Sequence, residues 1–130
     1  SETAFVELEV RSRNNDKLAA HTKHLVGCLE DACEKFGAKL DCNVSTSYLG
    51  YSHPADHPLV LKLSEVVRAA GMTPELAASG GGSDANNFNR SGISAVVLGT
   101  GMSKVHTTQE ELAVSDLEDT ANLVLSLCTL

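Results

Sequence analysis

Aromatic side chains are scarce in this chain of 130 residues: they make up 4% of the sequence, and tryptophan is absent. Platforms that stack bases or sugars are therefore not expected. Lysine and arginine number 10 against 17 aspartates and glutamates, which gives a net charge of −7. Nucleic acids and anionic membranes both need clustered basic side chains, so this balance argues against either as the main partner.

Long apolar runs are also lacking. No stretch approaches the roughly 20 residues of a membrane span, and the first residues do not have the pattern of a signal peptide. The four cysteines form no Cys-x-x-Cys pair and lie within apolar patterns, which is typical of free, buried thiols in a reducing compartment. With 42% hydrophobic and 21% charged residues, the composition is that of a folded globular protein. We expect a soluble, cytoplasmic protein.

The first fifty residues predict a strand, a helix and a second strand. Apolar and polar residues alternate at residues 4–12 and again at residues 40–45, as in strands with one face in water. Between them, apolar residues recur at helical spacing. The run Asn14-Asn15-Asp16 offers an N-cap, and Gly37 stands where a left-handed C-cap belongs.

The sequence pattern changes from residue 49 onward. Residues 49–58 contain glycine, two prolines and two histidines, and we take them as a hinge or domain boundary. Three further helices are expected, at residues 58–70, 84–90 and 115–128. The last of these is predicted to begin at a capping box, Ser115 to Glu118.

Short all-apolar runs lie between these helices, at residues 76–78 and 93–98. Such runs are typical of parallel strands that are covered on both faces. The patterns together predict an α/β protein with two parts, residues 1–50 and residues 51–130.

A glycine-rich loop, Ser79-Gly-Gly-Gly-Ser83, lies between a predicted strand and a predicted helix. Glycine lets a backbone approach a ligand closely, and the amides at a helix N-terminus favour an anion such as a carboxylate. A flexible turn in which Ser83 or Asp84 caps the helix explains the same residues. The spacing alone leaves both interpretations open.

A second loop, residues 99–111, begins where a predicted buried strand ends and contains His106. A neutral imidazole there is suited to bind zinc, but zinc needs three or four protein ligands, and no second ligand cluster is visible in the sequence. A solvated histidine is the simpler interpretation. Carboxylates for acid–base chemistry are available at Asp84, Glu110 and Glu111.

Taken together, the two loops, SGGGSDANNF and GTGMSKVHTTQEE, resemble the C-terminal end of the zinc-dependent metallopeptidases of peptidase family M20. That family includes peptidase T, carboxypeptidase G, aminoacylase and succinyl-diaminopimelate desuccinylase. The similarity is strongest to the peptidase T-like tripeptidases. The first residues, FVELEVRSRNNDKL, resemble a strand of the family's lid or dimerisation domain. The resemblance therefore covers nearly the whole chain.

This resemblance implies a role for six residues. His106 matches the last metal ligand of a two-zinc site, and the other five match positions beside the substrate: Arg11, Gly81, Gly82, Ser83 and Asn86. In several relatives an arginine at the position of Arg11 grips the substrate carboxylate. Some members carry a substrate-binding arginine near the position of Asn86, so the asparagine here is a departure.

The same resemblance implies a domain organisation and an activity. Residues 1–50 would form half of a lid domain (β-α-β), and residues 51–130 the C-terminal part of an α/β catalytic domain. The family's other zinc ligands and its catalytic glutamate precede the lid, so no catalytic residue is expected within these 130 residues. The intact enzyme would be an exopeptidase that hydrolyses short peptides or N-acyl amino acids with a free carboxylate. This chain alone is expected to be inactive.

Two alternatives stay open at this stage. A non-catalytic module with the same fold would use the chain for dimerisation or would bind an anion or carboxylate in the glycine-rich loop. A self-contained hydrolase would use His106 and Asp84 without a metal. As a partner we expect a second copy of the chain, paired through the lid segment, or a missing N-terminal segment that completes the sheet.

Overall fold

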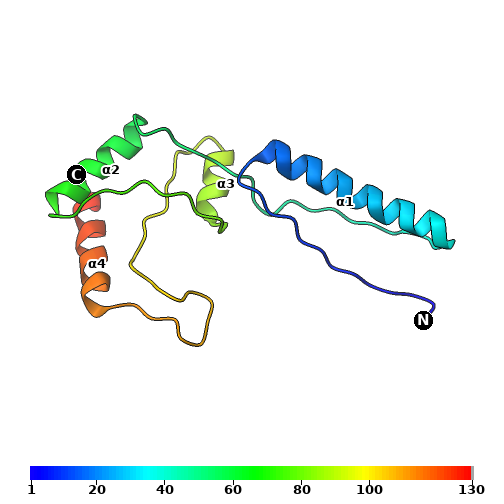
Figure 1. The fold of residues 1–130 in the computed structure, drawn as a ribbon. Coiled ribbons are helices and arrows are strands. Elements are labelled where there is room, and N and C mark those ends of the chain that lie inside the picture. Colours follow the sequence, from blue (N-terminus) through cyan, green and yellow to red (C-terminus); the bar gives the residue numbers. More distant parts are fainter. Residues whose placement is uncertain (130) are drawn as a thin grey trace. The chain divides into compact units, whose positions relative to one another are not determined.

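The computed structural model describes residues 1–129, and that range contains four α-helices (Figure 1). They are α1 (Asn15–Phe36), α2 (Pro58–Ala69), α3 (Asp84–Arg90) and α4 (Val114–Cys128). The chain divides into two compact units. The first comprises Ser1–Tyr51 and Ser79–Ser91, so α1 and α3 belong to it, and the second comprises Ser52–Ala78 and the chain from Gly92 onward.

Both ends of α1 are capped as predicted. The side-chain oxygen of Asn14 accepts a hydrogen bond from the Lys17 amide at 2.9 Å, which satisfies one of the free donors of the first turn. At the other end Gly37 adopts a left-handed backbone with φ of 67°, a conformation that costs glycine little. None of the 22 residues of α1 is buried, so the helix is only partly covered within its unit.

The predicted strands are not formed within residues 1–129: the one paired position is an isolated antiparallel bridge between Ser103 and Glu111. Residues 4–12 and 40–45 instead run as irregular chain beside α1 (Figure 1). A strand is stable only when a neighbour about 4.8 Å away receives its backbone hydrogen bonds. The alternating pattern is present, but its apolar side chains stay exposed, among them Phe5, Val6 and Val44.

The second unit has a small core between α2 and α4, which pack against each other. Val60 and Val66 from α2 and Leu123 from α4 are buried there. His57 caps α2, because its Nδ1 accepts a hydrogen bond from the Leu59 amide at 3.2 Å. The predicted capping box of the last helix was wrong: α4 begins one residue earlier, with Ala113 as its N-cap.

The four cysteines are free, as predicted, but they are not buried in this structure. Cys28, Cys42 and Cys128 are exposed, and Cys33 is half-buried. The apolar faces on which they were placed have too few neighbours here to cover them. Among the described residues, none of the helices combines the length and the apolar character that a membrane crossing requires.

Candidate functional site

The glycine-rich loop lies in the first unit and leads into α3. Two of its amides are already used: Gly81 donates to the Ser79 hydroxyl at 3.1 Å, and Ser83 donates to Asn86 Oδ1 at 2.9 Å. Gly82 lies between them, and its N–H has no acceptor among the residues the structure describes. The loop therefore offers a ligand one free amide from these three residues.

A close contact explains one glycine of this loop. A Cβ on Gly82 would lie 2.8 Å from Cε2 of the Tyr48 ring and closer still to Cδ2. Gly81 has no such conflict, since its nearest neighbour would be the Ser79 hydroxyl at 3.6 Å. The absence of a side chain at Gly82 thus allows Tyr48 to pack against the loop.

Asn86 acts inside the protein rather than toward solvent. Its Nδ2 donates to the Leu49 carbonyl at 2.7 Å, while its Oδ1 accepts from Ser83. Asn15 binds Gly50, the residue after Leu49, in a similar way. Its side-chain amide exchanges two hydrogen bonds with the Gly50 backbone, at 2.8 and 2.9 Å. Residues 49 and 50 are consequently held to α1 and to α3 at once.

Arg11 forms a two-pronged ion pair with Glu9. Its Nε and Nη2 lie 2.8 and 3.0 Å from the two carboxylate oxygens, and both side chains are about 70% exposed. This hydrogen bonding lowers the pKa of Glu9 and raises the pKa of Arg11. The pair lies at the surface, where water competes for each of its hydrogen bonds.

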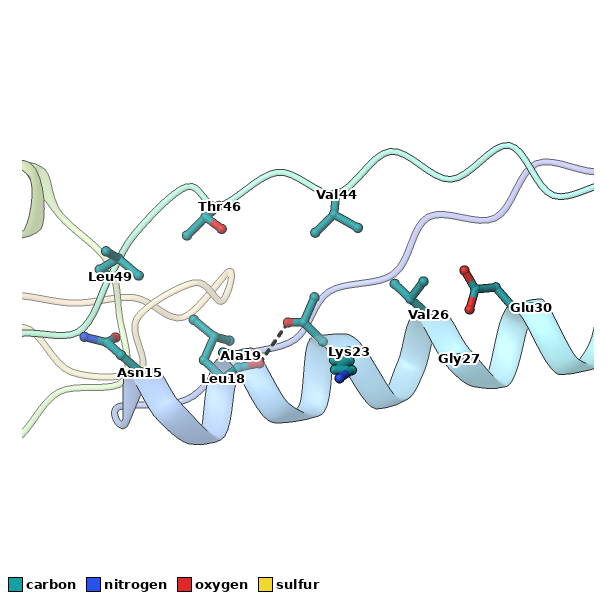
Figure 2. A pocket seen from close by; sticks show the side chains of 11 residues that line it. Asn15, Leu18, Ala19, Lys23, Val26, Gly27, Glu30, Val44, Thr46 and Leu49 are labelled. Carbon is teal, nitrogen blue, oxygen red and sulfur yellow. Dashed lines mark hydrogen bonds between the residues drawn. The ribbon is translucent and has the colours of Figure 1, made fainter.

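An open groove of about 650 Å³ follows α1 in the same unit (Figure 2). Its walls are mostly apolar, with Leu18 and Val26 on the helix facing Val44 and Leu49 on the returning chain. Among the described residues that line it, Lys23 and Glu30 are the charged ones. These described lining residues offer no group of three possible metal ligands.

His106 belongs to a loop in the second unit, and the two ends of this loop are bonded to each other. The loop starts from the antiparallel bridge in which Ser103 and Glu111 exchange backbone hydrogen bonds at 3.0 and 3.2 Å. Glu111 also pairs with Lys104 at 2.8 Å. Just before the bridge, Gly101 has φ of 84° and packs against Asp116 in the first turn of α4.

His106 itself has a left-handed backbone, with φ of 64°. Its amide donates to Glu110 Oε2 at 2.8 Å. The residue is exposed, and its imidazole makes no hydrogen bond with any residue of the described range. The ring is therefore available to an external ligand.

The structure places the predicted site residues in two groups. Arg11, Asn86 and the glycine-rich loop are in the first unit, and His106 is in the second. Asp84 is also in the first unit, so neither unit contains both members of the metal-free pair considered above. Within residues 1–129, no three His, Cys, Asp or Glu side chains are grouped so that they could hold a metal ion. Within the described residues, the chain can therefore supply a metal ion with one ligand, the imidazole of His106.

Two features of these sites escaped the sequence analysis. The sequence pattern places Asn15 only in the capping run at the start of α1. Its clamp on Gly50 joins residues 35 positions apart, which no local pattern signals. Glu110 had been noted as a possible acid or base, whereas the structure shows it accepting from the His106 amide. Its separation of four residues from the histidine was the one available signal.

Comparison with protein families settles the relationship. The model of peptidase family M20/M25/M40 matches residues 41–129. The chain belongs to this family. It is similar to the aminopeptidase PepT of Bacillus cereus, with a TM-score of 0.73 and 33% identity over 87% of the chain. A tripeptidase of Staphylococcus aureus gives a TM-score of 0.76 and 32% identity over 88%. These similarities support the predicted α/β fold class.

Sequence relatives agree with this assignment. The protein YqjE of Bacillus subtilis is 29% identical over 92% of the chain, and a succinyl-diaminopimelate desuccinylase of Helicobacter hepaticus is 27% identical over 80%. The chain spans about a third of the length of YqjE and about 30% of the two solved peptidases. It is a peptidase-family chain that corresponds to part of its relatives.

Proposed function

We propose that this chain is the C-terminal part of a zinc-dependent exopeptidase that hydrolyses short peptides or N-acyl amino acids with a free carboxylate. Family membership supports a hydrolase of the peptidase type. The similar structures are an aminopeptidase and a tripeptidase, and one relative is a desuccinylase. A tripeptide and a succinyl-diaminopimelate both carry free carboxylates, which is why we propose that class.

The observation that carries the proposal is the free imidazole of His106 on a closed loop. Its backbone is held by Glu110, and its ring has no hydrogen-bond partner among the described residues. We assign it as one ligand of a zinc site whose remaining ligands lie outside this chain. When bound, zinc would polarise the scissile carbonyl and generate hydroxide near neutral pH.

The substrate side of the proposal uses the first unit. Arg11 would bind the substrate carboxylate after releasing Glu9, and the free amide of Gly82 would add a backbone donor. Gly81, Ser83 and Asn86 would shape this loop rather than contact the substrate, because their polar groups are bonded within the protein. The resulting pair of donors favours a carboxylate over an uncharged chain end.

The chain alone would not be active, because one imidazole cannot hold a zinc ion that needs three or four protein ligands. We propose that it works as a homodimer through residues 1–50 or is completed by another polypeptide segment. Exposed apolar residues support either arrangement, because a partner chain or segment would cover them. Four residues are each more than half exposed: Phe5, Val6, Leu8 and Val44. Val6 and Leu8 alternate with Glu7 and Glu9, as in a strand that is paired with a neighbour.

The second candidate is a non-catalytic module for dimerisation or carboxylate binding. The exposed guanidinium of Arg11 and the free amide of Gly82 are the observations that favour it. The two candidates differ in their response to a chelator, since carboxylate binding by Arg11 and Gly82 needs no metal. Binding that survives the chelator would support the module.

A chimaera tests the exopeptidase proposal. In it, this chain replaces the matching 30% of the Bacillus cereus aminopeptidase, and zinc content and tripeptide hydrolysis are measured. We expect hydrolysis by the chimaera, and loss of both hydrolysis and about one zinc per protomer in His106→Gln. His21→Gln is the matched control, because His21 is an exposed histidine on α1. Full hydrolysis by the His106→Gln chimaera would refute the proposal.

A further inference from the structure

The backbone of the His106 loop is unusual in one respect. His106 and Lys104 are the two non-glycine residues with positive φ in the described range, at 64° and 51°. L-residues avoid this left-handed region because the β-carbon approaches the following carbonyl oxygen. A residue held there requires other interactions that outweigh the cost.

Glu110 supplies such an interaction at His106. Its Oε2 accepts the His106 amide hydrogen at 2.8 Å, a bond strengthened by the negative charge of the acceptor. The position of Glu110 is fixed in turn, because its own amide donates to the Thr107 carbonyl at 3.2 Å. The Thr107 hydroxyl donates to the Lys104 carbonyl at 2.7 Å, which ties the turn back to the other left-handed residue.

Glu111 has different bonding partners from Glu110. It bonds to Ser103 and Lys104 across the base of the loop, and within the described range it makes no hydrogen bond or ion pair with His106. The base of the loop and the histidine at its tip are therefore held by two adjacent carboxylates. This separation allows the two effects to be distinguished by substitution.

We propose that Glu110 is a positioning residue for His106. Its carboxylate holds the His106 amide, keeps the backbone left-handed and so fixes the direction in which the imidazole leaves the chain. The proposal rests on the proposed function, in which that imidazole is a zinc ligand. A ligand with a fixed direction loses less conformational freedom on binding, and the loss of one hydrogen bond to a charged acceptor corresponds to about tenfold in affinity.

The conformational part is tested on the chain itself by NMR, without any metal. Glu110→Met keeps the length of the side chain but removes the acceptor, and Glu110→Gln keeps an acceptor oxygen without the charge. In Glu110→Met we expect the His106 amide to exchange with solvent about tenfold faster or more and the carbon shifts of His106 to lose their left-handed values. Glu110→Gln should restore most of both.

Glu111→Gln is the control inside the loop, and we expect it to leave the His106 amide protected. Unchanged amide exchange in Glu110→Met would overturn the proposal. Equal behaviour of the Met and Gln variants would also overturn it, because the hydrogen bond would then not be the cause. None of these outcomes depends on zinc, so they are independent of the proposed function.

The metal-directed part uses zinc affinity, measured in the chimaera by competition with a chromophoric chelator. Glu110→Met should weaken the affinity about tenfold, and Glu110→Gln should weaken it much less. If His106→Gln removes a zinc but Glu110→Met leaves the affinity unchanged, positioning by Glu110 is overturned and the proposed function stands. If His106→Gln removes no zinc, the proposed function fails, and this part of the inference fails with it.

Discussion

Gly101 provides a quantitative test of how the His106 loop is attached to α4. Its φ is 84°, and a Cβ there would lie 2.5 Å from Oδ2 and 3.0 Å from Cγ of Asp116. Gly92 in the same unit is a matched control, because its φ is 82° and a Cβ there would meet nothing within 4 Å. The two glycines share a left-handed backbone and differ in what an added methyl group would contact.

The expected costs follow from this difference. Gly92→Ala should lower the free energy of unfolding by about 1–2 kcal/mol, the penalty of a left-handed L-residue. Gly101→Ala should lower it by the same amount and roughly 1–3 kcal/mol more, because the Asp116 carboxylate must move away from its place beside the turn. Urea unfolding followed by circular dichroism at 222 nm measures both variants.

A double-mutant cycle then isolates the contact. Asp116→Ala removes the carboxylate but keeps the Asp116 Cβ, which would lie 3.0 Å from the new methyl group, so the combined variant Gly101→Ala with Asp116→Ala should recover part of the additional loss. Equal destabilisation by Gly92→Ala and Gly101→Ala would refute the reasoning, as would a combined variant with strictly additive losses. Either result would mean that the loop is not packed against the first turn of α4.

Three further predictions concern the first unit and the thiols. The pKa of Glu9 should rise when Arg11→Gln removes its hydrogen-bond partner, as followed by NMR titration. Since the folded-state pKa of Glu9 is lowered, the pair contributes at neutral pH and is lost as the pH falls through that pKa; an unchanged pKa in the variant would refute the pairing. Cys33 should react with a thiol reagent more slowly than the other three thiols, since only it is half-buried; four equal rates would contradict this. Gly82→Ala should displace the Tyr48 ring and change its NMR signals, whereas Gly81→Ala should not; unchanged signals in Gly82→Ala would show that the ring does not pack there.

The sequence predicted the helices well, because their signals are local. Asn14 and Gly37 cap α1 through contacts within a few residues of the chain. The recurrence of apolar residues every three or four positions can likewise be recognised without a distant partner. The strands depended on a neighbour that the sequence pattern does not include. Their alternation at residues 4–12 is clear, yet no ladder forms there.

The candidate site shows the same division between local and distant contacts. His106 could be selected from its loop and from the family resemblance. The clamps made by Asn15 and Asn86 join residues at least 35 positions apart, so nothing in the local sequence marks them. Glu110 lies four residues from His106, but its role depends on a left-handed backbone that only the structure reveals.

The measurement that tests the central claim most directly is the zinc content and tripeptide hydrolysis of the purified 130-residue chain by itself. Our account assigns one zinc ligand, His106, to this chain and the others to another segment. It therefore predicts zinc well below one equivalent per chain after gel filtration, and no hydrolysis above the background rate. One or two tightly held zinc ions per chain, with hydrolysis that a chelator abolishes, would contradict it.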